Sequence, residues 1–167
     1  MPAITQPLRD EHRELLPHIE HLRIAADAVG ELSDVALKRR LDGVHDFLLN
    51  QLIPHAEAED KALYPVVAKA MGAAQATATM SRDHVEVGRL THELGALRGQ
   101  LTMGRFTSAQ ENALRRVLYG LYALVKVHFA KEEEIYLPLL DARLAPDEAQ
   151  KMFEEMARLS HGGHSHH

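Results

Sequence analysis

Apolar residues recur at intervals of three and four along almost the whole chain, and this spacing constrains the fold more than any other feature of the sequence. Residues at these intervals lie on one face of an α-helix. Alanine and leucine dominate the apolar 46% of the chain, and aromatic residues make up only 5%. This composition favours helices over a β-sandwich or barrel. A chain of 167 residues is long enough for one domain with a substantial core.

The periodic segments predict four long helices. The first runs from Gln6 to about Val29, and the second runs from an N-cap at Ser33 to Met71. The third reaches about Leu97, and its start within residues 72–80 is open between a loop and a first helical turn. The fourth begins at a capping box formed by Ser108 and Glu111.

A shorter helix follows the four long ones, because Pro146 suits a first helical turn and the apolar pattern continues to about Leu159. We therefore predict an all-α fold, an up-down-up-down four-helix bundle with a short fifth C-terminal helix. Residues 1–145 form the bundle, residues 146–160 form a helix packed on or beside it, and residues 161–167 form a His-rich flexible tail. Two prolines, Pro17 and Pro54, fall inside predicted helices and are expected to kink them.

Charge and composition exclude several classes of protein. The net charge is −5 and the acidic residues are dispersed, which disfavours a surface for nucleic acid or for anionic membranes. The chain has no cysteine, so disulfides, iron–sulfur clusters and thiolate metal sites are excluded. No apolar run is long enough to span a membrane, and the first residues lack the apolar core of a signal peptide. We therefore expect a cytoplasmic protein.

One eleven-residue pattern occurs twice. Residues 55–65 read HAEAEDKALYP and residues 128–138, 73 positions later, read HFAKEEEIYLP. Each begins with histidine, has glutamate four residues later and ends in proline. The other two predicted helices carry His12 and His84, which lie 72 residues apart and each follow an acidic residue. A helical pair repeated in this way can pack with approximate two-fold symmetry, which would bring the four histidines to one central region.

The repeated histidines and glutamates lie on apolar helix faces. His128 and Glu132 continue the apolar stripe of the fourth helix, and His55 and Glu59 interrupt that of the second. One such pair is usually a surface pair, but two inward pairs need another explanation. Burying an ionised glutamate costs free energy unless it is paired, and no lysine or arginine on these stripes is placed to pair with Glu59 or Glu132. The pattern predicts a buried metal site with the ligands His12, His55, Glu59, His84, His128 and Glu132.

The ligand types indicate which metal is held. Imidazole suits iron, zinc, copper and nickel, and carboxylates add the hard character that suits iron or manganese. Residues four apart on a helix are separated by about 6 Å along its axis, so each glutamate can lean inward to bridge two ions. Four histidines and two bridges leave open positions for water, oxide, hydroxide or a substrate. The residues themselves predict a site for two metal ions and leave iron, manganese and zinc open.

At this point the chain resembles a known family, the hemerythrin-like (HHE cation-binding) domains, in the branch with four histidines and two glutamates. The resemblance covers residues 6–142 and includes the phrases EDKALYP and EEEIYLP. It implies a four-helix bundle that holds an oxo- or hydroxo-bridged pair of non-haem irons, so we expect two iron ions rather than zinc or manganese. Such centres bind dioxygen, sense oxygen or iron, or react with peroxide or nitric oxide. The residues that carry the resemblance are His12, His55–Glu59, His84 and His128–Glu132.

The sequence departs from the oxygen-carrying hemerythrins at two places. Those proteins have a second histidine four residues after the one on the third helix, where this chain has Gly88. They also have aspartate five residues after the last histidine, where this chain has Glu132 at plus four and Glu133 at plus five. The missing imidazole leaves an extra open position, which favours redox reactivity over reversible oxygen carriage. Close packing is the alternative explanation for the glycine.

Three functions follow as hypotheses. The first is a non-haem di-iron protein that binds or senses dioxygen, or senses redox or iron state. The second is a di-iron enzyme that decomposes peroxide or reduces a small oxidant, and the third is a bundle that metal merely stabilises. The partner would be dioxygen, peroxide or another small diatomic ligand.

The remaining polar residues receive separate expectations. Tyr64 and Tyr136 are expected in the core or beside the centre, where a hydrogen bond from a tyrosine is an option. The His-rich tail could capture metal. The other histidines are expected away from the centre, and four acidic residues near the motifs are expected on a solvated face: His18, His21, His45, His92, Glu57, Asp60, Glu133 and Glu134.

Overall fold

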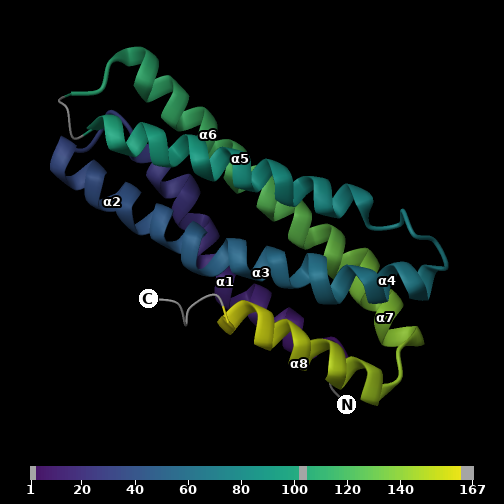
Figure 1. Ribbon diagram of the computed structural model, residues 1–167. Helices are drawn as coiled ribbons and strands as arrows, with labels where there is room; N and C mark the ends of the chain where they lie inside the picture. The colour runs from purple at the N-terminus through teal and green to yellow at the C-terminus, as the bar shows by residue number, and fades with distance from the viewer. Residues whose placement is uncertain (1–2, 102–104, 163–167) are drawn as a thin grey trace.

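The computed structural model describes residues 3–101 and 105–162, and it confirms the all-α fold. Four long helices run antiparallel to their neighbours in sequence, and a shorter C-terminal helix lies along one side of them (Figure 1). Part of the predicted flexible tail, residues 163–167, lies outside the described residues. None of the helices in the described ranges combines the length and the apolarity that a membrane crossing requires.

The helices are divided into α-helical and π-helical segments. Three π-helical turns occur within the long helices, namely η1 (Leu48–Leu52), η2 (Glu59–Leu63) and η3 (Glu132–Tyr136). The α-helical segments are α1 (Gln6–Ala28), α2 (Asp34–Phe47), α3 (Ile53–Ala58), α4 (Tyr64–Met71), α5 (Ala78–Leu101), α6 (Ser108–Lys131), α7 (Leu137–Arg143) and α8 (Pro146–Gly162).

The segments join into the predicted helices. From α2 to α4 the chain is helical without a break, and the same holds from α6 to α7, so these stretches form the second and fourth long helices. The second ends at Gly72, as predicted, with the glycine in the left-handed conformation at φ 68°. The third helix begins at Ala78 and continues to Leu101, four residues beyond the predicted end at Leu97.

The start of the fourth helix is shifted by one residue from the prediction. Thr107, not Ser108, is the N-cap: its hydroxyl accepts a hydrogen bond from the Gln110 amide at 3.1 Å, and the Gln110 side chain accepts one from the Thr107 amide at 2.8 Å. Both positions fit the sequence rule for a capping box, so the rule alone does not choose between them. Thr107 has extended backbone angles, whereas Ser108 is already helical.

Each π-helical turn ends two residues before a proline. Pro54, Pro65 and Pro138 follow η1, η2 and η3 in this way. A proline cannot donate to the carbonyl four residues earlier, and a wider turn before it accommodates the missing hydrogen bond within a continuous helix. The predicted disturbance at Pro54 is therefore a π-helical turn. Pro17 lies inside α1, which is α-helical throughout.

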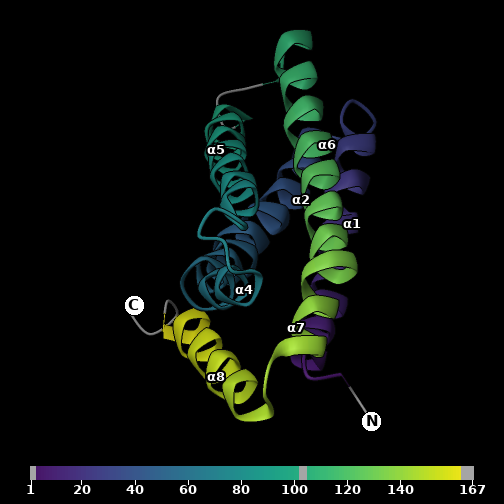
Figure 2. The same ribbon diagram turned by 90° about the vertical axis from the view of Figure 1, so that its right-hand side faces the viewer.

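The four long helices form a ring, and the second and fourth also contact each other where α4 meets α7. The helix α1 packs against α2 and α6, and α5 packs against the same two helices (Figure 2). The side chains between them form two separate apolar clusters. One contains Ile19 and Leu121, and the other contains Leu63 and Leu137. The interval between the two clusters is where each long helix carries its predicted histidine.

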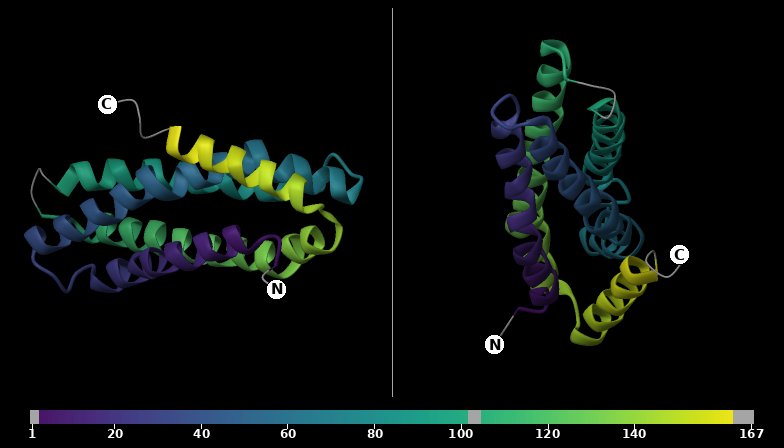
Figure 3. Two further views of the ribbon diagram at one scale, coloured as in Figure 1. Left: turned by 90° about the horizontal axis from the view of Figure 1, so that it is seen from below. Right: turned by 90° about the vertical axis from the view of Figure 1, so that its left-hand side faces the viewer.

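The short helix α8 covers one side of the bundle. It packs against α3 and η2 and buries Met152 and Met156 in the second apolar cluster (Figure 3). Ile135 lies seven residues after His128, a spacing that predicts an inward side chain in an α-helix, but it lies in η3 and is 57% exposed. A π-helical turn holds more residues per turn than an α-helix, so it rotates the residues within it away from the α-helical stripe.

The observed cap gives a direct test of the register of the fourth helix. Replacing Thr107 with alanine should lower the free energy of unfolding by about 1 kcal/mol, because the Gln110 amide loses the hydroxyl that accepts its hydrogen bond. Replacing Ser108 with alanine should change it by less than about 0.5 kcal/mol. Urea unfolding of both variants at equal metal content measures the difference. A larger effect at Ser108 would contradict the observed cap.

Candidate metal centre

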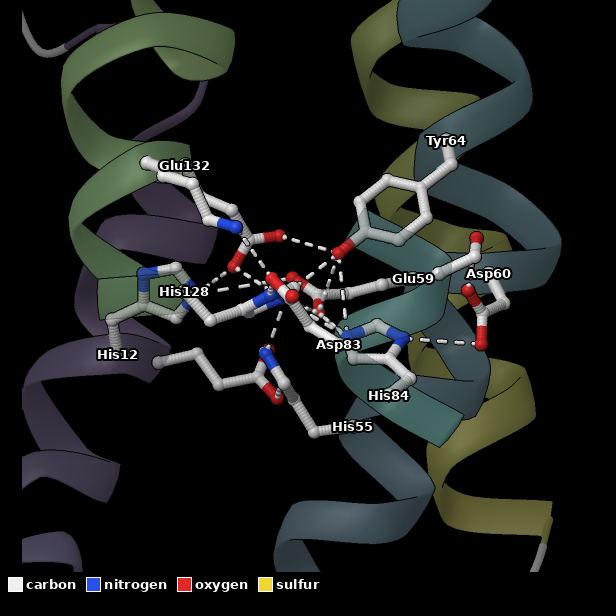
Figure 4. Close-up of polar contacts among 12 residues, drawn as sticks. His12, His55, Glu59, Asp60, Tyr64, Asp83, His84, His128 and Glu132 are labelled. Atoms are coloured by element: carbon white, nitrogen blue, oxygen red, sulfur yellow. Dashed lines mark hydrogen bonds and ion pairs between the residues drawn. The ribbon is translucent and has the colours of Figure 1, made fainter. Parts of the chain in front are cut away.

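All six predicted ligands meet in the layer between the two apolar clusters (Figure 4). One histidine comes from each long helix, and the two glutamates are the first residues of η2 and η3. The side chains are almost completely enclosed: Glu59 and Glu132 have no exposed surface, and His84, the most exposed of the six, retains 9% of its side-chain surface.

The six residues form two groups that share Glu59. In each group, one nitrogen or oxygen atom from every member lies within 4.8 Å of the others, close enough to hold one cation. The first group contains His12, His55, Glu59 and Glu132, and the second contains Glu59, His84 and His128.

The two oxygens of Glu59 face different pairs of imidazoles. Its Oε2 lies 3.3 Å from His55 Nε2 and 3.9 Å from His12 Nε2. Its Oε1 lies 3.2 Å from His84 Nε2 and 3.6 Å from His128 Nε2. Glu132 also lies between the groups, since its Oε1 is 3.3 Å from His12 Nε2 and 3.6 Å from His128 Nε2. Glu59 thus turns one oxygen to each group, and Glu132 Oε1 lies near one histidine of each group.

The donor atoms of the first group lack the hydrogen bonds that buried polar atoms normally make. His12 Nε2, His55 Nε2, Glu59 Oε2 and Glu132 Oε1 are all buried without a hydrogen-bond partner. A buried polar atom left unpaired costs roughly 1–3 kcal/mol, so four in one place need a common partner. A cation would bond to all four. The residues present therefore fit a metal held by nitrogen and oxygen ligands.

A second layer of carboxylates holds the imidazoles. Each of the four histidines turns its Nδ1 atom toward an acidic side chain, which fixes the ring so that Nε2 faces the centre. The pairs are His12 with Glu133 at 2.8 Å, His55 with Glu11 at 2.6 Å, His84 with Asp60 at 3.1 Å and His128 with Asp83 at 2.9 Å.

This layer corrects the prediction that Asp60 and Glu133 lie on a solvated face. Each directly follows a glutamate of the centre and reaches across to a histidine of another helix. The sequence held a signal for this, because Asp60 and Glu133 are 73 residues apart, the same interval as the repeated motif. Glu57 and Glu134, which the repeat does not pair, are exposed as predicted.

The pKa values in the cluster show that its buried carboxylates favour positive charge on the groups beside them. Burial disfavours a charged imidazole, but the adjacent Glu132 and Glu59 outweigh it and raise the pKa of His12 to about 9. Burial also disfavours the charged form of Glu59, but His55 and the other histidines outweigh it and hold the pKa of Glu59 well below its usual value. Burial and the negative charge of Glu59 raise the pKa of Glu132 to about 7. A bound metal would replace the protons that these histidines otherwise hold.

Tyr64 adds a hydroxyl to the centre, beside the second group. Its oxygen lies 2.9 Å from His128 Nε2, 3.1 Å from Glu132 Oε2 and 3.3 Å from His84 Nε2. Burial and the charges of Glu59 and Glu132 raise the pKa of Tyr64 far above its usual value, so the phenol is protonated and donates a hydrogen bond. Tyr136 instead donates to the backbone carbonyl of Ala76 at 3.4 Å and lies away from the centre.

Gly88 does not serve close packing. A Cβ atom at this position would meet nothing within 4 Å, so the backbone is not approached by a neighbour. The structure therefore contradicts the packing explanation for this glycine. His21 and His92 are exposed, and His18 stacks on Phe47. None of these histidines belongs to the two groups, in agreement with the prediction.

Comparison with known proteins identifies the family. The family model described as "Hemerythrin HHE cation binding domain" matches residues 3–140, most of the chain and all six clustered residues. Searches of curated proteins and of solved structures gave no match. The arrangement of the cluster fits the branch with four histidines and two glutamates. The chain belongs to the hemerythrin HHE cation-binding domain family.

Proposed function

We propose that the protein holds two iron ions at this cluster and uses them to bind or sense dioxygen, or to sense redox or iron state. The observation that carries the proposal is the pair of groups joined by Glu59, in which four buried donor atoms have no hydrogen-bond partner. Two carboxylates placed between two sets of imidazoles match what two adjacent cations need. The same donors would also accept zinc or manganese, so metal analysis is part of the test.

Each residue of the cluster has a distinct part in this proposal. His12 and His55 would hold one ion, His84 and His128 would hold the other, and Glu59 and Glu132 would span both. An iron pair supplies one-electron and oxygen chemistry that amino acid side chains lack. The apolar clusters on either side keep bulk water from the polar layer.

A small-molecule reaction is the second candidate, and Tyr64 is the observation that favours it. Its protonated hydroxyl is in contact with His84, His128 and Glu132. Cations bound at the centre would offset the charge of Glu59 and Glu132 that holds this proton, so the hydroxyl could then donate it to a bound oxidant, as peroxide decomposition or the reduction of a small oxidant would require. The open space beside Gly88 is consistent with this candidate.

Iron content and oxygen response test the proposal together. Protein loaded with ferrous iron without oxygen should retain about two irons per chain, and oxidation should produce near-ultraviolet charge-transfer absorption. His55→Ala and His84→Ala should each lower the iron content, because each removes one imidazole from a different group. Reversible spectral change on adding and removing oxygen supports binding. Oxygen evolution from peroxide supports the enzyme. Retained metal with neither response and with no spectral change on reduction and reoxidation leaves only a structural role, and one zinc per chain contradicts the iron pair.

The contact between Glu133 and His12 predicts a large difference between adjacent glutamates. Glu133→Gln should weaken iron binding about 10- to 100-fold, because it removes the charge that orients and strengthens the imidazole. Glu134→Gln is the matched control, since Glu134 is exposed and is the next residue in the same turn. Competition with a chelator measures both affinities. Equal affinities for the two variants would show that the carboxylate has no part in metal binding.

Replacing Tyr64 with phenylalanine separates the two candidate functions. The variant keeps the buried ring and removes only the hydroxyl, so iron content should remain at the wild-type value. If the phenol supplies a proton, peroxide consumption should fall by about 10²- to 10⁴-fold. Tyr136→Phe is the control, because its hydroxyl lies away from the centre. Unchanged peroxide consumption in Tyr64→Phe excludes the proton-donor role.

A further inference from the structure

A groove between α1 and α2 forms a second candidate site, separate from the metal centre. Its cavity volume is about 660 Å³, within the range of pockets that bind small molecules. His18 and His21 from α1 line one side, and Arg39 and Arg40 from α2 line the other. His18 is six residues beyond His12, about 9 Å further along the helix axis, so this groove is not part of the metal cluster.

The groove presents positive charge that the protein does not neutralise. Within residues 3–101 and 105–162, neither Arg39 nor Arg40 has an ion pair or a side-chain hydrogen bond. Asp42, one turn away, is already paired with Lys38 at 2.8 Å and with Arg98 at 2.9 Å. The chain as a whole carries a net charge of −5, so a groove with two unpaired arginines has the opposite sign of charge from the protein as a whole.

The floor of the groove is apolar and aromatic. Phe47 and Val44 line it, and both are otherwise buried. The ring of His18 stacks on that of Phe47, with ring centroids 4.9 Å apart and planes 15° from parallel. The ring of His21 stands nearly perpendicular to that of His18. A flat ring surface of this kind favours another planar ring as a ligand.

Gly43 keeps the groove open. It lines the cavity in the interior of α2, one turn after Arg39 and Arg40, and a Cβ atom there would meet nothing within 4 Å. Glycine inside a helix is destabilising relative to alanine. Neither a positive φ angle nor a close neighbour requires it here. The space over the helix is what this glycine provides.

From these four observations we propose that the groove between α1 and α2 binds a small aromatic anion, a molecule with a planar ring and a carboxylate, sulfonate or phosphate group. The ring lies on His18, whose imidazole is itself stacked on the buried Phe47. The anionic group faces Arg39 and Arg40, whose guanidinium groups match carboxylate and phosphate geometry. This site does not depend on which metal the centre holds.

Two dyes that share a ring system test both halves of the proposal. The first is 8-anilinonaphthalene-1-sulfonate, an aromatic anion, and the second is N-phenyl-1-naphthylamine, which lacks the sulfonate. Fluorescence titration of the metal-loaded protein should show one saturable site for the anion. The double variant Arg39→Gln/Arg40→Gln should weaken its binding about tenfold or more and leave the neutral dye within about twofold, because only the anionic group loses its partners.

Filling the groove is the complementary test. Gly43→Leu should abolish saturable binding of both dyes, since its side chain occupies the space over α2. Gly99→Leu is the matched control: Gly99 is also an exposed helical glycine with open space, but it lies on α5. Arg89→Gln, on α5, is the control for loss of an exposed arginine outside the groove. Unchanged metal content shows that each variant is folded.

Two results would overturn the proposal. The first is the absence of a saturable site for the anionic dye in the wild-type protein. The second is equal affinity for that dye in the wild-type protein, in Arg39→Gln/Arg40→Gln and in Gly43→Leu, which would place the bound dye elsewhere.

Discussion

The burial of two carboxylates governs the rest of the structure. Glu59 and Glu132 have no exposed surface, and in the described part of the chain no lysine or arginine pairs with either. A buried negative charge must be met by positive charge, and here four imidazoles surround the two glutamates. The core accordingly consists of two apolar clusters separated by one polar layer. Each long helix contributes a histidine to that layer, so the four helices must be in register at this level.

The sequence predicted the fold and the six central residues because both depend on periodicity. Apolar spacing located the long helices, and the interval of 72 to 73 residues related their polar positions. The sequence indicated only half of the acidic residues that contact the four histidines. Glu11 and Asp83 stood out as repeated acids, but Asp60 and Glu133 looked like ordinary surface residues because each follows another acid. Their role depends on contacts between different helices, which the spacing within one helix does not determine.

The π-helical turns explain where the predictions failed within the helices. Stripe predictions assume a constant angle per residue, and a π-helical turn changes that angle. Ile135 is therefore exposed although α-helical spacing places it inside. Two of these turns also contain the carboxylates of the centre, since η2 and η3 begin at Glu59 and Glu132. Pro65 and Pro138, which end the repeated motifs, are thus tied to the geometry of the two carboxylates, although neither proline is a ligand.

The two halves of the repeat are similar but chemically unequal. In the first motif the order before proline is Leu63–Tyr64, and in the second it is Tyr136–Leu137. This exchange of two neighbours puts the Tyr64 hydroxyl into the polar layer, while its counterpart Leu137 lies in the apolar cluster with no exposed surface. The Tyr64 hydroxyl therefore contacts His84 and His128, and no tyrosine in the described part of the chain makes a matching contact with His12 or His55. The repeated motif accounts for two groups of residues that could each hold a cation, and this local exchange makes the surroundings of the two groups differ.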